Sequence, residues 1–133
     1  MRIKQVSVFV GNETGRLVDM LTPLAHSKID ILALSVADSA DFGIVRLVVS
    51  NPEKAVKALH KAGFTLRVNE VLSYQVPDVP GGLLETVAEP LAKADINLEY
   101  FYAFIQSEAG KATVVLKASD LDGAEAALKR LQH

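Results

Sequence analysis

The stretch QVPDVPGGL, residues 75–83, ends a strand pattern and begins a helix pattern. Strand-forming residues run from Glu70 to Val76 and stop at Pro77, and apolar residues recur at helical spacing from Leu83 onward. Two prolines and two glycines lie between these patterns. A connection of this kind leaves free backbone N–H groups at the start of the helix. We therefore expect the loop to suit the carboxylate of a small ligand.

The same arrangement occurs near the beginning of the chain, in VGNETGRL, residues 10–17. Aligning the two loops places Gly15 opposite Gly81 and, with one added residue in the second helix, Pro23 opposite Pro90. The alignment also matches Leu17 with Leu83, Ile29-Asp30-Ile31 with Ile96-Asn97-Leu98, and Gly43 with Gly110. Such self-similarity predicts two copies of one structural unit, residues 1–69 and 70–133.

Each unit is predicted to contain a strand, the loop, a helix, two strands and a second helix, and the first unit adds a final strand. Asn51 and Pro52 are typical of a helix start, as cap and first helical residue. Ser119 and Asp120 are expected to cap a helix that runs through Leu131. We expect strands at residues 3–10, 29–37, 42–50, 64–76, 96–106 and 111–118, turns at 38–41 and 107–110, and further helices from Arg16 and Leu83.

A βαββαβ unit of about 65 residues has one well-known compact arrangement. Four antiparallel strands form a sheet and both helices cover one face, giving a ferredoxin-like α+β sandwich. The second unit lacks its last strand, so the edge beside residues 71–76 needs a partner strand or stays open. Apolar residues on both faces of residues 29–37 and 100–105 indicate that the other face is covered. We therefore expect the units to associate, and the protein to form a homodimer.

Composition excludes several classes of partner. The net charge is −2 with no basic block, which argues against nucleic acid and anionic membranes. Cys is absent, and His26, His60 and His133 have no ligand spacing, so we expect no metal site and no cofactor. No window approaches about 18 apolar residues. We expect a cytoplasmic protein without a membrane span.

The two loops, their repetition and the topology together resemble the ACT domain, and the chain looks like the small stand-alone proteins built from two tandem ACT domains. The resemblance implies an amino-acid-binding regulatory module whose ligands sit between two units. The stretches that carry it are residues 12–17, 40–44, 78–83 and 97–104. It implies these ligand-binding residues: Asn12, Glu13, Thr14, Gly15, Arg16, Leu17, Asp30, Ile31, Asp78, Val79, Pro80, Gly81, Gly82, Leu83, Asn97 and Leu98.

The two sites are expected to be unequal. The family often has Asn three residues before the loop Gly and again near the start of the second strand. This chain has Asn12 and Asn97 at two of these positions, but Asp78 and Asp30 at the others. If each site joins one unit's loop to the other unit's strand, Asn12 meets Asn97 and Asp78 meets Asp30. Two carboxylates would repel a ligand carboxylate, so we expect the Asn12/Asn97 site to bind more tightly, although the Pro/Gly loop is the better-formed turn.

Structural interpretations of the same residues remain open. The loop glycines are also common as plain turn residues, and the aromatic cluster at residues 100–104 is more often sheet core or interface than pocket lining. No catalytic motif is present, so we expect a non-enzyme that binds a free amino acid and modulates an enzyme or transporter. The alternatives are a small enzyme on a ferredoxin-like scaffold and a structural regulatory subunit with vestigial pockets.

Overall fold

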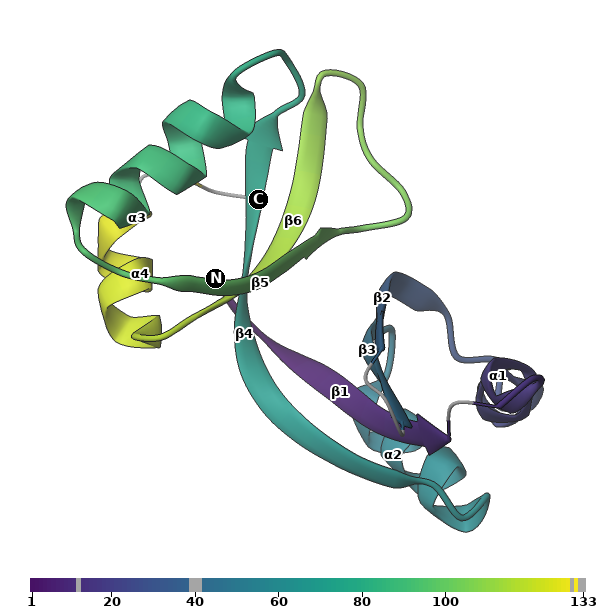
Figure 1. The fold of residues 1–133 in the computed structure, drawn as a ribbon. Helices are drawn as coiled ribbons and strands as arrows, with labels where there is room; N and C mark the ends of the chain where they lie inside the picture. Colours follow the sequence, from purple (N-terminus) through teal and green to yellow (C-terminus); the bar gives the residue numbers. More distant parts are fainter. Residues whose placement is uncertain (12, 39–41, 130, 132–133) are drawn as a thin grey trace. The chain divides into compact units, whose positions relative to one another are not determined.

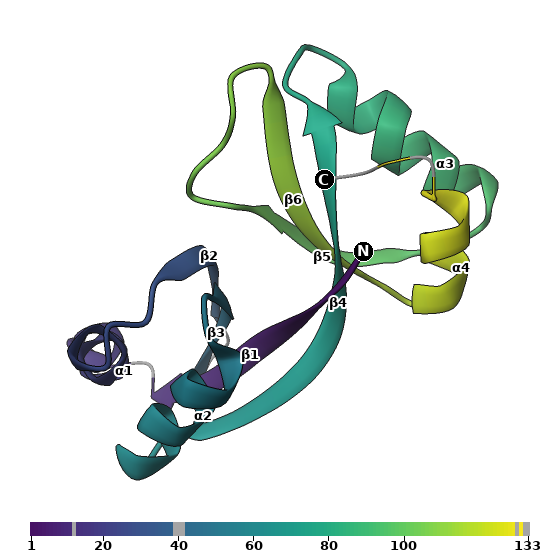
Figure 2. The same cartoon turned by 180° about the vertical axis from the view of Figure 1, so that it is seen from behind.

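The structure is a computed structural model that describes residues 1–11, 13–38, 42–129 and 131 of the 133-residue chain. The chain divides into two compact units. One is Lys4–Asn69, and the other joins Met1–Ile3 to Glu70–His133. Figures 1 and 2 show the elements of each unit from opposite sides.

Strands and helices follow the predicted order along the chain. Hydrogen-bonded strands are arranged as β2-β3-β1-β4-β6-β5, and β1 and β4 each contribute residues to both units. None of the helices in the described ranges has both the length and the apolar character needed to cross a membrane. The elements are β1 (Arg2–Gly11), α1 (Arg16–His26), β2 (Ile31–Asp38), β3 (Phe42–Val49), α2 (Pro52–Lys61), β4 (Thr65–Pro77), η1 (Leu84–Ala88), α3 (Glu89–Lys93), β5 (Leu98–Ala103), β6 (Lys111–Ala118) and α4 (Leu121–Ala127).

The Lys4–Asn69 unit is a βαββαβ sandwich. Antiparallel pairing of β1 with β3 places Val6 opposite Leu47, and β3 also pairs with β2. Met20 of α1 and Leu59 of α2 are fully buried against these strands. The core therefore lies between the sheet and its two helices, which confirms the predicted ferredoxin-like arrangement.

The second unit repeats this packing with β4, β6 and β5. Leu72 pairs with Leu116 and Tyr74 with Val114 across the antiparallel β4–β6 ladder. These side chains, together with Leu91 of α3, belong to a second buried core. Burial of the Tyr74 side chain raises the pKa of its phenol above the ordinary value. In Figure 1, α3 and α4 lie on the same face of this three-stranded group.

The place of the missing strand is taken by the beginning of β1. No strand follows α4 among the described residues. Instead, Met1 accepts a hydrogen bond from the Ser73 N–H at 2.8 Å, and its amino group donates to the Ser73 carbonyl at 3.3 Å. The Arg2 guanidinium contacts the carboxylates of Glu70, Asp122 and Glu125. The edge of β4 that the sequence left open is thus paired at Ser73 and flanked by an ion-pair cluster.

Backbone hydrogen bonds reproduce the sequence repeat. The Asp30 N–H donates to the Ser50 hydroxyl at 3.0 Å, and the Asn97 N–H donates to the Ser119 hydroxyl at 3.3 Å. The return bonds, from the N–H of each serine to the carbonyl of its partner, are both 2.9 Å. The two second strands therefore begin in the same way, as the alignment of Asp30 with Asn97 predicts.

One pair of the sequence alignment is wrong. Val10 pairs with Gly43 on β3, whereas Val76 pairs with Ala112 on β6. Because Gly15 and Gly81 match, Val10 and Val76 also match, so the position equivalent to Gly43 is Ala112 rather than Gly110. Gly110 serves a different purpose: it has a φ of +78°, a backbone conformation that glycine adopts readily.

Two predicted elements also extend more than one residue too far at their C-terminal ends. The last helix ends at Ala127 rather than at Leu131, because the Leu131 N–H closes a tighter turn onto the Leu128 carbonyl at 2.8 Å. Strand β5 ends at Ala103 instead of residue 106, although Phe104 still donates one bond to the Thr113 carbonyl. The turn expected at residues 38–41 falls mostly on residues 39–41, outside the described part of the chain.

The one-residue insertion appears in the structure as a widened helical turn. In both helices the first bond closes onto the loop glycine, from Asp19 to Gly15 and from Glu85 to Gly81, each at 3.0 Å. The bonds at the far ends also match, since Ser27 donates to Pro23 and Ala94 to Pro90, each at 3.1 Å. The additional residue of the second helix is absorbed between these ends. There η1 is a π-helical turn, in which the Glu89 N–H bonds to the Leu84 carbonyl.

Helix caps give a first testable prediction. The Asn51 side chain accepts a hydrogen bond from the Lys54 N–H at 3.1 Å at the start of α2. We expect Asn51→Ala to lower the free energy of unfolding by about 1 kcal/mol, because one orphan N–H loses its partner. Urea unfolding measures this loss. Asn51→Asp keeps the acceptor oxygen and should stay close to the parent protein, and an equal loss in both variants would contradict the capping role.

Candidate functional site

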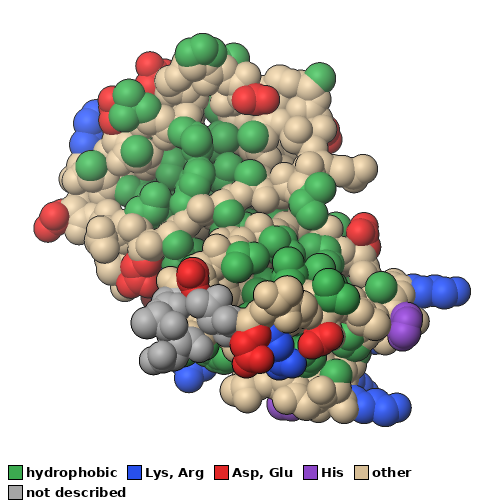
Figure 3. All heavy atoms as spheres, turned by 45° about the vertical axis from the view of Figure 1, so that its right-hand side comes forward, with side chains coloured by type: hydrophobic (Ala, Val, Ile, Leu, Met, Phe, Trp, Pro, Cys, Tyr) green, Lys and Arg blue, Asp and Glu red, His purple; other side chains and the backbone are tan. Residues whose placement is uncertain are grey.

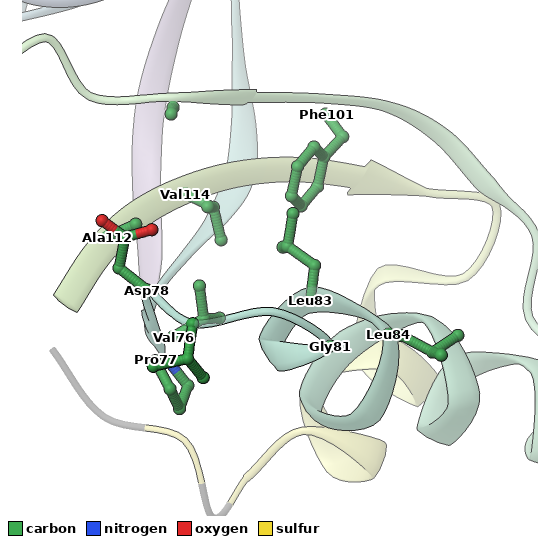
Figure 4. Close-up of a pocket in the computed structure, with 11 residues that line it drawn as sticks. Val76, Pro77, Asp78, Gly81, Leu83, Leu84, Phe101, Ala112 and Val114 are labelled. Atoms are coloured by element: carbon green, nitrogen blue, oxygen red, sulfur yellow. The ribbon is translucent and has the colours of Figure 1, made fainter. Parts of the chain in front are cut away.

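A pocket of about 330 Å³ lies in the second unit, beside the Pro/Gly loop. The loop and the start of its helix form one wall, and strands β5 and β6 form the other (Figure 4). The lining residues are Val76, Pro77, Asp78, Val79, Gly81, Leu83, Leu84, Phe101, Ala103, Ala112 and Val114. The stretch that ends β4 and begins a helix thus forms one side of a cavity.

Glycine geometry makes this loop tight. The Asp78 N–H bonds to the Gly110 carbonyl at 3.0 Å, and the Gly82 N–H closes a turn onto the Val79 carbonyl at 2.9 Å. Gly81 has a φ of +80°, where a side chain would be strained. A Cβ on Gly82 would overlap the Pro77 carbonyl oxygen. Replacement of Gly82 would therefore move the wall of the pocket, and replacement of Gly81 would strain its backbone.

The pocket surface is almost entirely apolar. Val76 and Val114 are buried at its base, and Figure 4 shows the Phe101 and Leu83 side chains pointing toward one another. Asp78 is the single charged residue among the lining residues, and its carboxylate lies at the end away from Phe101. The space-filling view shows apolar side chains gathered on the unit that contains α3 and β5 (Figure 3).

A second, smaller cavity continues this apolar surface. It measures about 200 Å³ and shares Leu83 and Phe101 with the first. Its other lining residues are Val87, Ala88 and Leu98. Since η1 spans Leu84–Ala88, the π-helical turn borders both cavities.

The helices after the two loops begin differently from the other two. Gly15 and Gly81 close the first bonds of these helices, and no side chain caps either start. By contrast, Asn51 and Asp120 cap α2 and α4 with their side chains. The loop helices therefore keep more of their first-turn N–H groups free of protein side-chain acceptors.

The first loop has a different chemical character. The Glu13 carboxylate and the Arg16 guanidinium lie close to Gly11. Arg16 forms an ion pair with Asp19 at 3.4 Å and its guanidinium lies 5.2 Å from the centre of the Phe64 ring. The family resemblance implies that Arg16 contacts a ligand. The structure gives it a protein carboxylate and an aromatic partner.

Part of the predicted ligand set lines the cavities. Asp78, Val79, Gly81 and Leu83 line the larger pocket, and Leu98 lines the smaller one. Pro80 and Gly82 shape the loop without lining either cavity. Asp30, Ile31 and Asn97 lie at the start of their second strands.

The pairing of sites stays a prediction. Asn12 lies outside the described residues. The predicted partnerships of Asn12 with Asn97, and of Asp78 with Asp30, each join residues of the two different units.

Several lining residues were not predicted from sequence. Phe101 was grouped with the other aromatic residues of β5, yet its ring faces the pocket and the core, while Tyr100 and Tyr102 stack with ring centres 6.5 Å apart. Alternation from Tyr100 to Ala103 carries the signal, because Phe101 pairs with the fully buried Leu116, whereas a register shift between Leu98 and Tyr100 interrupts the alternation before it. Ala103, Ala112 and Val114 join the pocket through strand registers that no single stretch of sequence reveals.

Comparison with known proteins places the chain in a family. A family model described as an ACT domain pair matches residues 1–131. The chain belongs to the ACT domain pair family. This membership confirms the resemblance that the two loops and their repetition indicate.

Solved structures agree with the family assignment. Protein BT0572 from Bacteroides thetaiotaomicron is similar to this ACT domain pair with 35% sequence identity, a TM-score of 0.90, and coverage of 99% of this chain and 91% of that one. The ligand-free regulatory subunit of aspartate kinase from Thermus thermophilus has 14% identity and a TM-score of 0.65, with 98% and 94% coverage. At that identity the likeness shows the fold alone. No curated protein matches the chain.

Proposed function

We propose that this ACT domain pair is a regulatory module that binds a free amino acid and modulates an enzyme or transporter. The observation that carries the proposal is the pocket beside the Pro/Gly loop, since the family resemblance implies that this loop forms one side of a ligand site. Its volume of about 330 Å³ is at the lower end of the range for small-molecule sites and suits a ligand of amino-acid size. The regulatory subunits of aspartate kinase, which share the fold, are consistent with a regulatory role.

The arrangement offers complementary groups for the charged end of an amino acid. At this loop, which the sequence leads us to expect as the weaker of two sites, the Asp78 carboxylate can attract the ligand ammonium, and the helix start after Gly81, which no side chain caps, can face the ligand carboxylate. No cysteine, hydroxyl or histidine side chain lines either cavity, so neither cavity presents a side-chain nucleophile of these types. This chemistry favours binding over catalysis. We further propose a cytoplasmic homodimer, in which a second copy extends the site.

A thermal-shift screen against the twenty common amino acids tests the function. We expect a saturable rise in the unfolding midpoint with one amino acid or a few of them, because a ligand that binds only the folded state stabilises it by mass action. At a concentration about 100 times the dissociation constant the gain is about 2.7 kcal/mol. Calorimetry on the positive compounds then measures the stoichiometry. The absence of any shift at millimolar concentrations would favour a structural subunit with vestigial pockets.

A further inference from the structure

We infer that the pocket of the second unit receives the side chain of an apolar amino acid, aliphatic or aromatic, and so sets the specificity of the module. The inference rests on the proposed function, since it names the class of amino acid that this site binds. It is carried by four features of the described residues: the apolar rim, the size and walls of the interior, the position of Asp78, and the contrast with the first loop.

The rim of the pocket exposes large apolar side chains. Val79, Leu83 and Leu84 are 58%, 44% and 55% exposed, although all three line the cavity. Exposed apolar groups that surround a concave apolar surface are typical of a binding site rather than of a plain solvent-facing loop. Each Å² of apolar surface that a ligand removes from water contributes roughly 25 cal/mol to the binding free energy. A ligand with an apolar side chain gains this contribution, and a polar one does not.

The interior has the size and shape for a branched or aromatic group. A cavity of about 150 Å³ lined by aliphatic and aromatic residues accepts benzene. Here the larger pocket offers about 330 Å³, and the Phe101 ring forms part of its wall facing Leu83 (Figure 4). An aromatic ligand can pack against this ring and an aliphatic one against Leu83 and Val114. A ligand as small as glycine or alanine would leave most of the apolar wall in contact with water.

The position of the single charge defines an orientation. Asp78 lies at one end of the pocket and the Phe101–Leu83 pair at the other (Figure 4). A ligand whose ammonium faces Asp78 directs its side chain toward Phe101. An acidic side chain at that end would be desolvated without a cation, because no Lys or Arg is among the lining residues. A lysine side chain would have to leave its second ammonium on the same apolar surface.

The first loop carries a charge at the corresponding position. Alignment of Gly15 with Gly81 places Glu13 opposite Val79. In the first unit the Glu13 carboxylate lies over Gly11, where an apolar ligand group would meet a charge. The preference for an apolar side chain therefore belongs to the loop of the second unit, and a single substitution can transfer the charge of the first loop to it.

The test combines a ligand panel with that substitution. Calorimetry on the full chain compares leucine, isoleucine and phenylalanine with aspartate, lysine and serine. We expect measurable binding of at least one apolar amino acid, and affinity at least 10-fold weaker for all three polar ones. Val79→Glu should weaken the affinity of this pocket for the apolar ligand at least 10-fold. The matched control is Ile105→Glu, which places the same charge on a 69% exposed apolar residue outside the pocket and should change affinity less than 2-fold.

A second variant blocks the pocket without a charge. Ala103 is exposed on strand β5 and lines the cavity, so Ala103→Leu fills the mouth from the surface and should also abolish binding. Circular dichroism verifies that all variants fold. Tight binding of a polar amino acid, unaffected by Val79→Glu and Ala103→Leu, would overturn the apolar specificity and leave the proposed function standing. If no amino acid binds at all, the proposed function itself fails, and the specificity fails with it.

Discussion

Deletion of Thr86 is expected to leave the protein folded, with a free energy of unfolding within about 1 kcal/mol of the parent protein. A one-residue deletion in a helix normally rotates one end against the other by about 100° and shifts it by about 1.5 Å. Here the π-helical turn η1 already contains the surplus residue. Removing Thr86 lets the helix return to a regular α-helix, with the loss of one hydrogen bond from the Thr86 hydroxyl to the Gly82 carbonyl.

The first unit shows why deletion of Thr86 would leave the side chains at both ends of the second unit's helix in the same orientation. Leu17 and Met20 are three residues apart, and the equivalent Leu83 and Val87 are four residues apart. Met20 and Val87 are both buried, while Leu17 and Leu83 are both about two-fifths exposed. Without Thr86 the spacing becomes three residues in both helices, so the buried residue can remain in the core.

Deletion of Asp19 is the matched control. It removes the residue before Met20 from a helix that has no surplus residue, so either Met20 leaves the core or the loop is displaced. We expect a loss of about 2–5 kcal/mol, the range for removal of a large buried side chain. Urea unfolding of both deletion variants decides the matter. Equal losses of unfolding free energy in the two variants would show that η1 does not accommodate the inserted residue.

This contrast also shows what the sequence could predict. The insertion itself was visible, because Gly15-to-Pro23 spans one residue fewer than Gly81-to-Pro90. Its structural form was not visible, because a loop extension, a kink or a π-helical turn would all satisfy the same alignment. Pro90 does not decide between these forms, because α1 carries Pro23 at the matching position and remains an α-helix. Only the observed bond from Glu89 to Leu84 identifies the form.

The paired edge of β4 was beyond sequence reasoning for a different reason. The unit boundary near residue 69 follows from the repeat, so residues 1–3 belong to the first copy by alignment. In the structure those residues form part of the second unit, where Met1 bonds Ser73 and Arg2 contacts Glu125. Pairing between residues about 70 positions apart depends on strand registers, which alternation along one strand does not specify.

The candidate site was predictable in its loop and not in its opposite wall. Asp78, Val79 and Gly81 were named as site residues because Pro and Gly mark the loop between a strand and a helix. Ala112 was not named, and Phe101 was weighed only within the aromatic cluster, where sheet core or interface was favoured over pocket lining. Their place in the pocket depends on the register of β6 against β4 and of β5 against β6. Local chemistry thus predicted the wall that is continuous in sequence, and pairing across the sheet supplied the other wall.

Gly82→Ala is expected to lower the free energy of unfolding by about 3 kcal/mol and to abolish amino-acid binding. A Cβ on Gly82 would overlap the Pro77 carbonyl oxygen, and this oxygen belongs to the backbone at the end of β4, so it cannot swing away as a flexible side chain would. The loop must open instead. The first loop shows such an opening, because its helix carries Arg16 at the equivalent position, and the turn bond from Arg16 to the Glu13 carbonyl is 3.3 Å instead of 2.9 Å.

Gly43→Ala provides the control on a glycine of the same repeat. Its added Cβ would meet the Ala37 carbonyl oxygen at 3.5 Å and the Val10 side chain at 3.6 Å, which are ordinary contacts. Alanine also occupies the equivalent position of the second unit, Ala112. We expect stability unchanged or raised by up to about 1 kcal/mol, since a strand glycine is replaced. Thermal unfolding and calorimetry of both variants measure the effects. Normal ligand binding by Gly82→Ala would show that the tight turn of the Pro/Gly loop does not shape the site.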